Sequence, residues 1–550
     1  MRPRSWILSV MLLLVIGGLL LYFTGDGAPP QAGEVSPTPE VTPSELPAAG
    51  AYDPEFTPGG EQPDPVSGQI FSADCSGYRL LVSVVTDDDF SVETSAPDVK
   101  EYAGLNYRYY DFALRLKGEP AGKLRLTLAG DGSSGTLWFL ESSATLPVEL
   151  TVAREGGVDA PDVHRMSYGS DEIELITADS GTFGAQDSIY VETDGVYVKA
   201  GRVIGLVDLG STVHRVEDVS ASVSFRADDG GFVLTQRLEA PEGGFSATHG
   251  ACCTSPLVDW SVDYKGAKVR NLDASTACYT VLSDGFYYEK PADYSPYEND
   301  SENRYVYKSA FSSLHRSLLE ANCGSFVRLM GLHLLYTRIE SFNDEGYIPN
   351  PCTSLWLLAD YGIGAGFYDT RFNIDAIRTL LFAEVSCDDP LIRSTVERAI
   401  GHFLDVRQEY GFTAAGELWT PDYLSADGQV SSTHASLNHA LAEGLTLVEA
   451  GLAYSRQDFI DAGLEIYGAI ERTGEIWIRD TGDLWYGISN TGEMVRDDYV
   501  SVTYNDLVAT VQQLSQMGLL ESYPHIRSLL ASKEEWLREN GGAHHIVTHP

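Results

Sequence analysis

The chain has 550 residues, 43% of them hydrophobic and 11% aromatic, so it is too long for one ordinary domain and apolar enough for two or three cores. Its formal net charge of -42 at pH 7 excludes nucleic acid as a partner, because phosphate binding needs a basic face. The same charge repels an anionic ligand unless salt screens the surface or the binding site carries its own arginine.

The N-terminal segment predicts a membrane anchor. Two arginines in the first four residues precede an 18-residue run without a charged side chain, Trp6 to Phe23. At 1.5 Å per residue, such a helix spans about 27 Å, enough for the core of a bilayer. Positive charge before the run keeps the N-terminus in the cytoplasm. We therefore expect a signal anchor at residues 1–23 of a single-pass cell-membrane protein with its bulk outside, and a cleaved signal peptide is the alternative.

Residues 24–67 contain no lysine or arginine, and proline recurs among threonine, serine, glutamate and glycine. A segment of this composition cannot bury enough apolar area to fold. It predicts a disordered stalk, stiffened by proline, between the anchor and the first folded domain.

Residues 68–300 show the pattern of a β-sandwich. Apolar and polar side chains alternate in short runs such as Leu124 to Leu128 and Val219 to Phe225. Glycine, aspartate and serine turns separate these runs roughly every ten residues, which is typical of antiparallel strands with one buried face. We expect a β-sandwich-like domain over this range.

The cysteines and histidines do not predict a metal site. All seven cysteines follow the predicted anchor, and no two of them have the CxxC spacing of a zinc site, which leaves both structural disulfides and buried free thiols open. His434 and His439 are five residues apart, which does not place both on one helix face. The chain also lacks a P-loop, a dinucleotide fingerprint and an HExxH motif, so we expect neither a metal nor a cofactor.

From about residue 303 the apolar period becomes helical. Asp389 before Pro390 predicts a capped helix start, and Ser455 with Asp458 resembles a capping box. Short loops between the helices imply antiparallel hairpins in a bundle or an α/α toroid. The predicted fold is α+β and multidomain, with an N-terminal transmembrane helix, a β-sandwich-like region, an all-α (α/α) toroid at 301–540 and a polar tail at 541–550. Helices are predicted at 307–341, 353–364, 370–386, 390–410, 433–454, 456–473, 502–517 and 523–539.

One stretch between two of these helices, residues 480–507, is dense in aspartate, tyrosine and tryptophan side chains. A loop of this composition between helices suits acid–base chemistry better than it suits a core. A toroid gathers its loops around one open end, where this stretch would meet Asp422 and Tyr423.

Several segments carry a resemblance. Arg496 to Tyr499, followed by Asn505 to Leu507, is similar to a motif Arg-Trp-Asp-Tyr closed by Asn-Gln-Leu. Asp480 to Tyr486 is similar to an Asp-Thr-Gly segment that leads into a tyrosine. Leu418 to Tyr423 resembles Trp-Tyr-Glu-Glu-Tyr, and Leu437-Asn438 also matches. In this order and spacing the motifs resemble those of the D-glucuronyl C5-epimerases, enzymes of heparan sulfate and heparosan modification, over residues 350–540.

The resemblance implies a catalytic α/α domain behind β-structure and a membrane anchor. It places catalytic roles on Tyr499, Tyr486 and Tyr423, and on Asp422 where the family has glutamate. The family's Asp-Leu-Arg after the middle tyrosine is replaced here, and so are its two histidines after the last tyrosine. Substrate-binding roles are predicted for five further residues: Arg496, Asn505, Trp485, Trp419 and Asn438.

The chemistry of C5 inversion explains why these residue types are needed. The reaction removes a proton beside a carboxylate and returns one to the opposite face of the sugar, so it needs an acid/base group on each face. Tyrosine, with an ordinary pKa of about 10, is a good proton donor. We expect Tyr423 and Tyr499 to flank the sugar ring and Asp422 to accept a proton. Arg496 suits the substrate carboxylate because its planar fork binds carboxylates bidentately.

The predicted protein is therefore a membrane-anchored, extracytoplasmic uronate C5-epimerase-like isomerase. Its partners are a uronic-acid-containing, heparan sulfate-like polysaccharide and the membrane, and a homodimer is left open. One alternative is a polysaccharide lyase or an inverting glycosidase, the latter with Asp422 and either Asp480 or Asp498 as its two carboxylates. The other is a non-catalytic glycan-binding surface protein.

Overall fold

The computed structural model describes most of the chain after the predicted stalk, with short gaps: residues 68–170, 172–262, 267–273, 279–289, 294–295, 303–310, 314–387, 389–429 and 433–547. The predicted anchor and stalk, residues 1–23 and 24–67, lie outside the described residues. In the part of the chain that is described, no helix is long and apolar enough to cross a membrane. The predicted N-terminal transmembrane helix and single-pass membrane location are therefore not supported and are corrected here.

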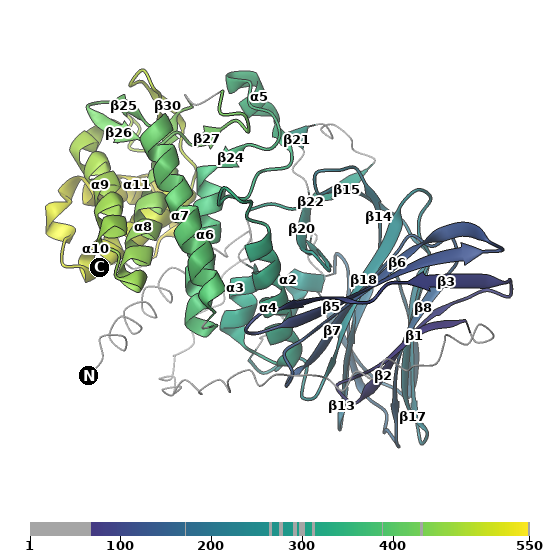
Figure 1. Ribbon diagram of the computed structural model, residues 1–550. Coiled ribbons are helices and arrows are strands. Elements are labelled where there is room, and N and C mark those ends of the chain that lie inside the picture. Colours follow the sequence, from purple (N-terminus) through teal and green to yellow (C-terminus); the bar gives the residue numbers. More distant parts are fainter. Residues whose placement is uncertain are drawn as a thin grey trace.

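The first half of the described chain consists of two antiparallel sheets (Figure 1). The smaller sheet has six strands, in the order β1 (Gln69–Cys75), β2 (Tyr78–Val84), β8 (Val148–Glu155), β17 (Gly231–Leu238), β16 (Ala221–Asp228) and β11 (Ser180–Gly184).

The larger sheet has fifteen strands, and β18 (Phe245–Cys253) is its branch point. One path runs β10 (Ile173–Thr177), β9 (Asp162–Ser167), β12 (Asp187–Thr193), β13 (Val196–Ala200), β18, β14 (Ile204–Asp208), β15 (Val213–Glu217), β22 (Arg304–Tyr307), β20 (Gly285–Glu289) and β19 (Tyr279–Leu282). The other leaves β18 through β7 (Gly135–Ser142), β6 (Glu119–Gly130) and β5 (Asn106–Leu116), which pairs with β3 (Phe90–Thr94) and β4 (Asp98–Glu101).

The alternating runs of the sequence explain the core of this region. In β2, Leu80 and Val82 are fully buried while Arg79 is exposed, and in β6 Leu124 and Leu126 are buried while Arg125 is exposed. A period of two puts these apolar side chains on one face, and the two sheets share one core there. Two packed sheets lie where the sequence predicted a β-sandwich-like domain, and the larger sheet extends to residue 307.

Helices dominate the second half and lie beside the sandwich (Figure 1). Most of them match the predicted ranges, and 370–386 and 390–410 match at both ends. The pattern at 307–341 is split by a turn after Ala321, and the short strands within this half correct the expectation of an all-α region. The helices are α2 (Ala267–Asp273), α3 (Leu314–Ala321), α4 (Ser325–Glu340), α5 (Leu355–Tyr361), α6 (Thr370–Ser386), α7 (Pro390–Tyr410), α8 (Leu437–Tyr454), α9 (Gln457–Thr473), α10 (Val502–Gln516) and α11 (Pro524–Glu539).

Of the two predicted helix caps, one is confirmed and the other is wrong. Asp389 accepts a hydrogen bond from the Leu391 backbone N–H at 2.9 Å, so this predicted cap is confirmed. The predicted capping box before α9 is wrong, because Ser455 is the left-handed C-cap of α8, with φ of 56°, and makes no side-chain cap for α9.

Three helices form an inner row, since α8 packs between α6 and α10, and each is backed by the helix that follows it, α7, α9 or α11. Buried side chains on all sides of α8, among them Leu441, Leu445 and Val448, explain why its sequence is apolar around most of its circumference. The segments that lead into α6, α8 and α10 contain short strands, among them β24 (Tyr368–Asp369), β27 (Tyr423–Leu424), β28 (Ala435–Ser436), β29 (Trp485–Ile488) and β30 (Met494–Asp497).

Candidate functional site

The short strands bring three loops together at the N-terminal ends of the inner helices. Asp369 of β24 pairs with Tyr423 of β27, and Ser436 of β28 pairs with Gly487 of β29. The predicted meeting of the 480–507 stretch with Asp422 and Tyr423 is therefore observed. Helix N-termini carry partial positive charge and orphan N–H groups, which favour anionic groups at such an end.

Asp422 lies at the centre of this cluster and is fully buried. Its Oδ1 accepts a hydrogen bond from the Ser436 backbone N–H at 2.8 Å and lies 3.5 Å from His439 Nδ1. Its Oδ2 lies 3.3 Å from His434 Nε2, but neither of these two buried atoms has a partner in hydrogen-bond geometry. Burial by itself raises the pKa of Asp422, yet His439, His434 and Ser436 outweigh burial and hold the pKa below its ordinary value. Asp422 is therefore a buried anion.

Three predicted tyrosines surround this anion. The ring of Tyr423 lies 5.7 Å from that of His439, and the ring of Tyr486 lies 5.3 Å from that of His434. The rings of Tyr486 and Tyr499 meet edge to face at 5.5 Å and 88°. Burial raises the pKa of each phenol, and the charge of Asp422 adds to that effect in all three. Tyr423 and Tyr486 are nearly buried, whereas Tyr499 is 54% exposed. The predicted tyrosines thus share one cluster that reaches solvent through Tyr499.

Two aromatic residues of α5 complete the cluster, and sequence reasoning missed both. The hydroxyl of Tyr361 is 2.8 Å from His434 Nδ1, and Trp356 packs 5.4 Å from Tyr423 and 6.0 Å from His434. When the Tyr361 hydroxyl donates this hydrogen bond to Nδ1, the neutral imidazole carries its proton on Nε2, which faces Asp422. The sequence carried no local signal for this contact, because 73 residues separate Tyr361 from His434.

Arg496 lies at the exposed edge of the cluster. It pairs with Asp360 of α5, and its guanidinium stacks 4.6 Å from the ring centre of Trp356. Its backbone φ of 62° is left-handed, which is uncommon for a residue with a Cβ. Both members of the ion pair are about half exposed, so the pair contributes little to stability and can exchange partners.

A buried lysine beneath the Tyr499 loop was also missed. Lys533 of α11 is fully buried and places its Nζ 2.6 Å from Asp483 Oδ1, 2.8 Å from Asp498 Oδ2 and 2.8 Å from the Tyr499 carbonyl oxygen. Three oxygens from two loops therefore meet one ammonium group, which fixes the backbone on which Tyr499 stands.

The remaining predicted residues are placed differently. Trp419 is 1% exposed and donates its indole N–H to the Ala414 carbonyl at 3.0 Å, so its ring is part of the core and offers no face to a ligand. Asn438 is buried in the first turn of α8 with its Oδ1 unpaired. Trp485 is half-buried, with Arg479 stacked on its ring at 4.9 Å. Asn505 is half-buried in the first turn of α10.

Two further buried carboxyl groups lie near Asp422. Asp369 caps α6, accepting from the Phe372 N–H at 2.9 Å, and burial raises its pKa to about 7. Glu443 of α8 is 2% exposed, and burial with the nearby charge of Asp422 raises its pKa to about 8. The cluster therefore holds one carboxyl whose pKa is lowered beside two whose pKa values are raised, a pattern typical of functional sites.

Glu443 gives a pH prediction. Its pKa is higher in the folded chain than the ordinary value of about 4.3, so the stability that it contributes is present at low pH and is lost as pH rises through about 8. Between pH 6.5 and 8, the ionisation of Glu443 lowers the unfolding free energy of the wild type by about 1 kcal/mol per pH unit. Glu443→Gln is expected to remove this part of the pH dependence, as measured by urea denaturation at several pH values. His439, whose pKa burial lowers to about 4, has finished titrating below this window. Glu521→Gln, at an exposed ion pair, is the control and leaves the slope unchanged.

Metal and disulfide chemistry find no support in the described residues. No group of three or more histidine, cysteine, aspartate or glutamate side chains in the described ranges is arranged to hold a metal ion. Cys75, Cys252 and Cys253 are buried free thiols in the sandwich, and burial raises the pKa of each.

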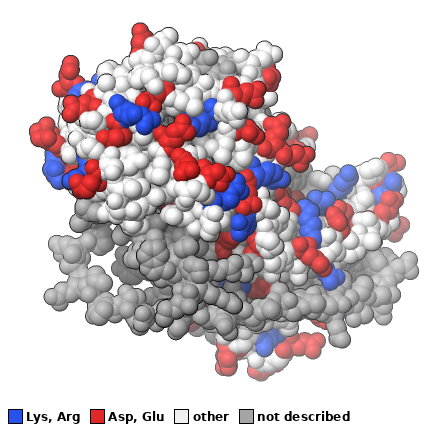
Figure 2. Space-filling model, turned by 60° about the vertical axis from the view of Figure 1, so that its left-hand side comes forward, with Lys and Arg blue, Asp and Glu red and all other residues white. Residues whose placement is uncertain are grey.

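Acidic and basic side chains are interspersed on the face of the molecule shown in Figure 2, with the acidic ones more numerous.

Comparisons with known proteins give a weak likeness in shape. No family model and no curated protein matches the chain. Among solved structures, D-mannose isomerase matches at 10% identity with a TM-score of 0.31, over 40% of this chain and 57% of its own. Unsaturated glucuronyl hydrolase from Bacillus sp. GL1 matches at 13% identity and 0.30, over 41% and 60%. Cellobiose 2-epimerase from Bacillus thermoamylovorans B4167 matches at 14% identity and 0.32, over 42% and 60%.

These matches cover about three fifths of each neighbour's length. All three neighbours are enzymes that act on sugars. Likeness at this level does not identify the D-glucuronyl C5-epimerase family, and it supports neither membrane association nor a homodimer.

Proposed function

We propose that the chain is a carbohydrate-active enzyme and that its cluster performs uronate C5-epimerase-type chemistry on a glycan. The observation that carries the proposal is the buried anion Asp422 between His434 and His439, with the rings of Tyr423, Tyr486 and Tyr499 around it. Proton removal and return at one carbon needs a proton acceptor and a proton donor in the same site. This cluster holds candidates for both.

The donor is assigned to Tyr499. Burial raises the pKa of Tyr499, so its hydroxyl is protonated at neutral pH, and its side chain is the one of the three that reaches solvent. Tyr486 packs against it and connects it to the buried part of the cluster. A protonated phenol at the mouth of the site can deliver a proton to a bound sugar.

The acceptor is assigned to Tyr361 together with His434 and Asp422. The phenol is hydrogen-bonded to one imidazole nitrogen at 2.8 Å, and the other imidazole nitrogen faces the carboxylate at 3.3 Å. Because Nδ1 of His434 lies within hydrogen-bond distance of the phenol, His434 can take the phenol proton when Tyr361 takes one from the substrate.

The substrate carboxylate is assigned to Arg496. Its ion pair with Asp360 is about half exposed, so a carboxylate that arrives from solvent can replace Asp360 at little cost. A guanidinium that lies next to Trp356 and interacts electrostatically with Tyr361 would stabilise the charge that builds on the carboxylate when the C5 proton leaves.

The test is isotope exchange. Residues 68–550 are incubated with N-acetylheparosan in deuterated water, and deuterium at uronate C5 is measured by mass spectrometry and NMR. Deuterium incorporation without chain shortening supports the proposal. Intact glycan without deuterium, over a series of uronate-containing chains, would exclude it.

A hydrolase is a second candidate because of one observation. Asp369 has a pKa raised to about 7, whereas that of Asp422 is lowered, and their neighbouring strands pair directly. Two carboxyl groups with opposite shifts suit the general acid and general base of a glycosidase. The other carboxylates considered fit less well, since Asp498 is bound to Lys533 and Asp480 is exposed.

The two candidates differ in their product. A hydrolase creates new reducing ends, and Asp369→Asn is expected to slow their formation by about 10²–10⁴-fold because it removes the proton donor. Reducing-end assays on the same glycans decide this. Under the epimerase proposal, no reducing ends form and Asp369→Asn leaves the C5 exchange within a few-fold of the wild-type rate.

A further inference from the structure

A second cavity lies on the open face of the larger sheet, well away from the cluster in sequence. We call it the sheet groove. Its volume is about 680 Å3, and its floor is formed by β5, β6 and β7 with β3 and the start of β18 at its sides. The side chains used below are Glu93, Asp111, Lys123, Arg125, Glu141 and Phe245.

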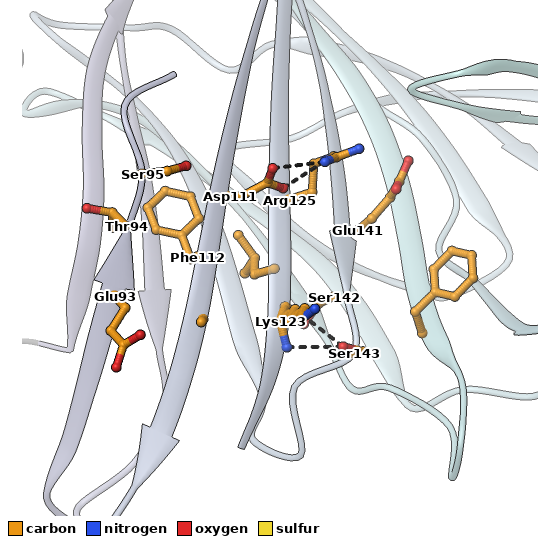
Figure 3. Close-up of a pocket in the computed structure, with 13 residues that line it drawn as sticks. Glu93, Thr94, Ser95, Asp111, Phe112, Lys123, Arg125, Glu141, Ser142 and Ser143 are labelled. Atoms are coloured by element: carbon orange, nitrogen blue, oxygen red, sulfur yellow. Dashed lines mark hydrogen bonds and ion pairs between the residues drawn. The ribbon is translucent and has the colours of Figure 1, made fainter. Parts of the chain in front are cut away.

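A row of charged side chains crosses the floor (Figure 3). Arg125 lies opposite Asp111 on one neighbouring strand and opposite Glu141 on the other. Its guanidinium donates to both oxygens of Asp111, at 2.7 and 2.8 Å. Arg125 and Asp111 are each about half exposed, so they keep hydrogen-bonding capacity toward the groove.

This lining suits sugar hydroxyls. Three acids, Glu93, Asp111 and Glu141, face two bases, Lys123 and Arg125, so the groove carries no excess of positive charge for a phosphate or sulfate. Neighbouring donors and acceptors in fixed positions match the paired hydroxyls of a sugar ring, and the half-buried ring of Phe245 offers an apolar surface beside them.

The sheet groove is linked to a second cavity. Glu141 accepts hydrogen bonds from the Ser283 N–H at 3.1 Å and the Ser283 hydroxyl at 2.7 Å. The next residue, Asp284, lines a cavity of about 580 Å3 between the sandwich and the helical half, which we call the interdomain hollow. There Lys308 pairs with Asp284 at 2.7 Å.

The lining of the interdomain hollow is joined to the candidate site through one buried side chain. Gly366 lines it, and the following residue, Phe367, packs its ring 6.0 Å from that of Tyr423. The linings of the sheet groove, the interdomain hollow and the tyrosine cluster are therefore connected to one another by directly contacting or adjacent residues.

We propose that the sheet groove binds sugar rings of a polysaccharide chain and that the chain continues through the interdomain hollow to the candidate site. The ligand class is a long, hydroxyl-rich glycan rather than a monosaccharide. The groove is a saccharide-binding site in its own right, and only its coupling to catalysis rests on the proposed function.

The experiment measures binding of long chains. The double variant Asp111→Ala/Arg125→Ala removes the charged row, and Arg226→Ala/Asp228→Ala removes a matched exposed pair, 3.2 Å apart, on the six-stranded sheet. Affinity electrophoresis with N-acetylheparosan and with a neutral β-glucan is expected to show about tenfold weaker binding of at least one polymer for the groove variant alone, because charged hydrogen bonds are lost. Equal binding by wild type and both variants, or no binding of either polymer, overturns the inference.

A second measurement separates this inference from the proposed function. The same binding series is repeated with Tyr499→Phe, which leaves the groove intact. If the wild type binds the polymer through the groove but shows no C5 exchange, the groove inference is upheld and the epimerase proposal is excluded. If the wild type shows C5 exchange and the groove variant has the same KM for polymer as the wild type, the epimerase proposal is upheld and the groove inference is overturned. An unfolding temperature equal to that of the wild type shows that the groove variant is folded.

Discussion

Tyr499→Phe is expected to reduce deuterium incorporation at uronate C5 by about 10²–10⁴-fold, the usual contribution of a positioned acid or base. The substitution removes one hydroxyl and keeps the ring that packs on Tyr486 at 5.5 Å, so the cluster keeps its shape. Because the Tyr499 side chain is 54% exposed, removing its hydroxyl creates no cavity in the core, and the unfolding free energy is expected to change by less than about 1 kcal/mol.

The control for this prediction is Tyr410→Phe. Tyr410 is half-buried at the C-terminal end of α7, outside the loops that form the cluster. Its variant is expected to exchange deuterium at the wild-type rate. Equal loss in both variants would indicate a general effect of removing a phenol, and full activity of Tyr499→Phe would exclude Tyr499 as the proton donor.

Lys533→Met is expected to produce the largest loss of stability, about 3–5 kcal/mol in unfolding free energy. Methionine fills a similar volume, but it leaves Asp483 and Asp498 as buried carboxylates without their cation. An ion whose partner is removed retains the full cost of its burial. Urea denaturation, monitored by tryptophan fluorescence, measures the change.

The same variant tests how Tyr499 is held. Lys533 binds the Tyr499 carbonyl oxygen at 2.8 Å, so we expect faster amide hydrogen exchange in the loop at 497–501 when the lysine is lost. The triple variant Lys533→Met/Asp483→Asn/Asp498→Asn removes all three charges and is expected to recover part of the stability. Arg527→Met, at an exposed ion pair, is the control and is expected to change stability by less than about 1 kcal/mol. If the unfolding free energy of Lys533→Met equals that of this control, the predicted role of the buried lysine is wrong.

The sequence by itself determined the local elements. A period of two indicated a region of antiparallel strands at 68–300, and a period of 3.6 residues placed the helices after residue 353, because these periods record which face of each element is buried. It also pointed to Asp422, Tyr423, Tyr486 and Tyr499, which the structure brings into one cluster. Their catalytic roles stay predictions. The N-terminal segment, from which a membrane-spanning helix was predicted, lies outside the described residues, and no described helix is long and apolar enough to cross a membrane.

The tertiary structure alone decided which distant residues meet. Tyr361 and His434 lie 73 residues apart, and Lys533 reaches Asp483 from 50 residues away, so no local pattern could pair them. The pKa values of Asp369 and Asp422 move in opposite directions because burial raises one, while two histidines outweigh burial for the other. Local periodicity reports the face that a side chain occupies, but its charge state and partners depend on contacts that form only when the chain has folded.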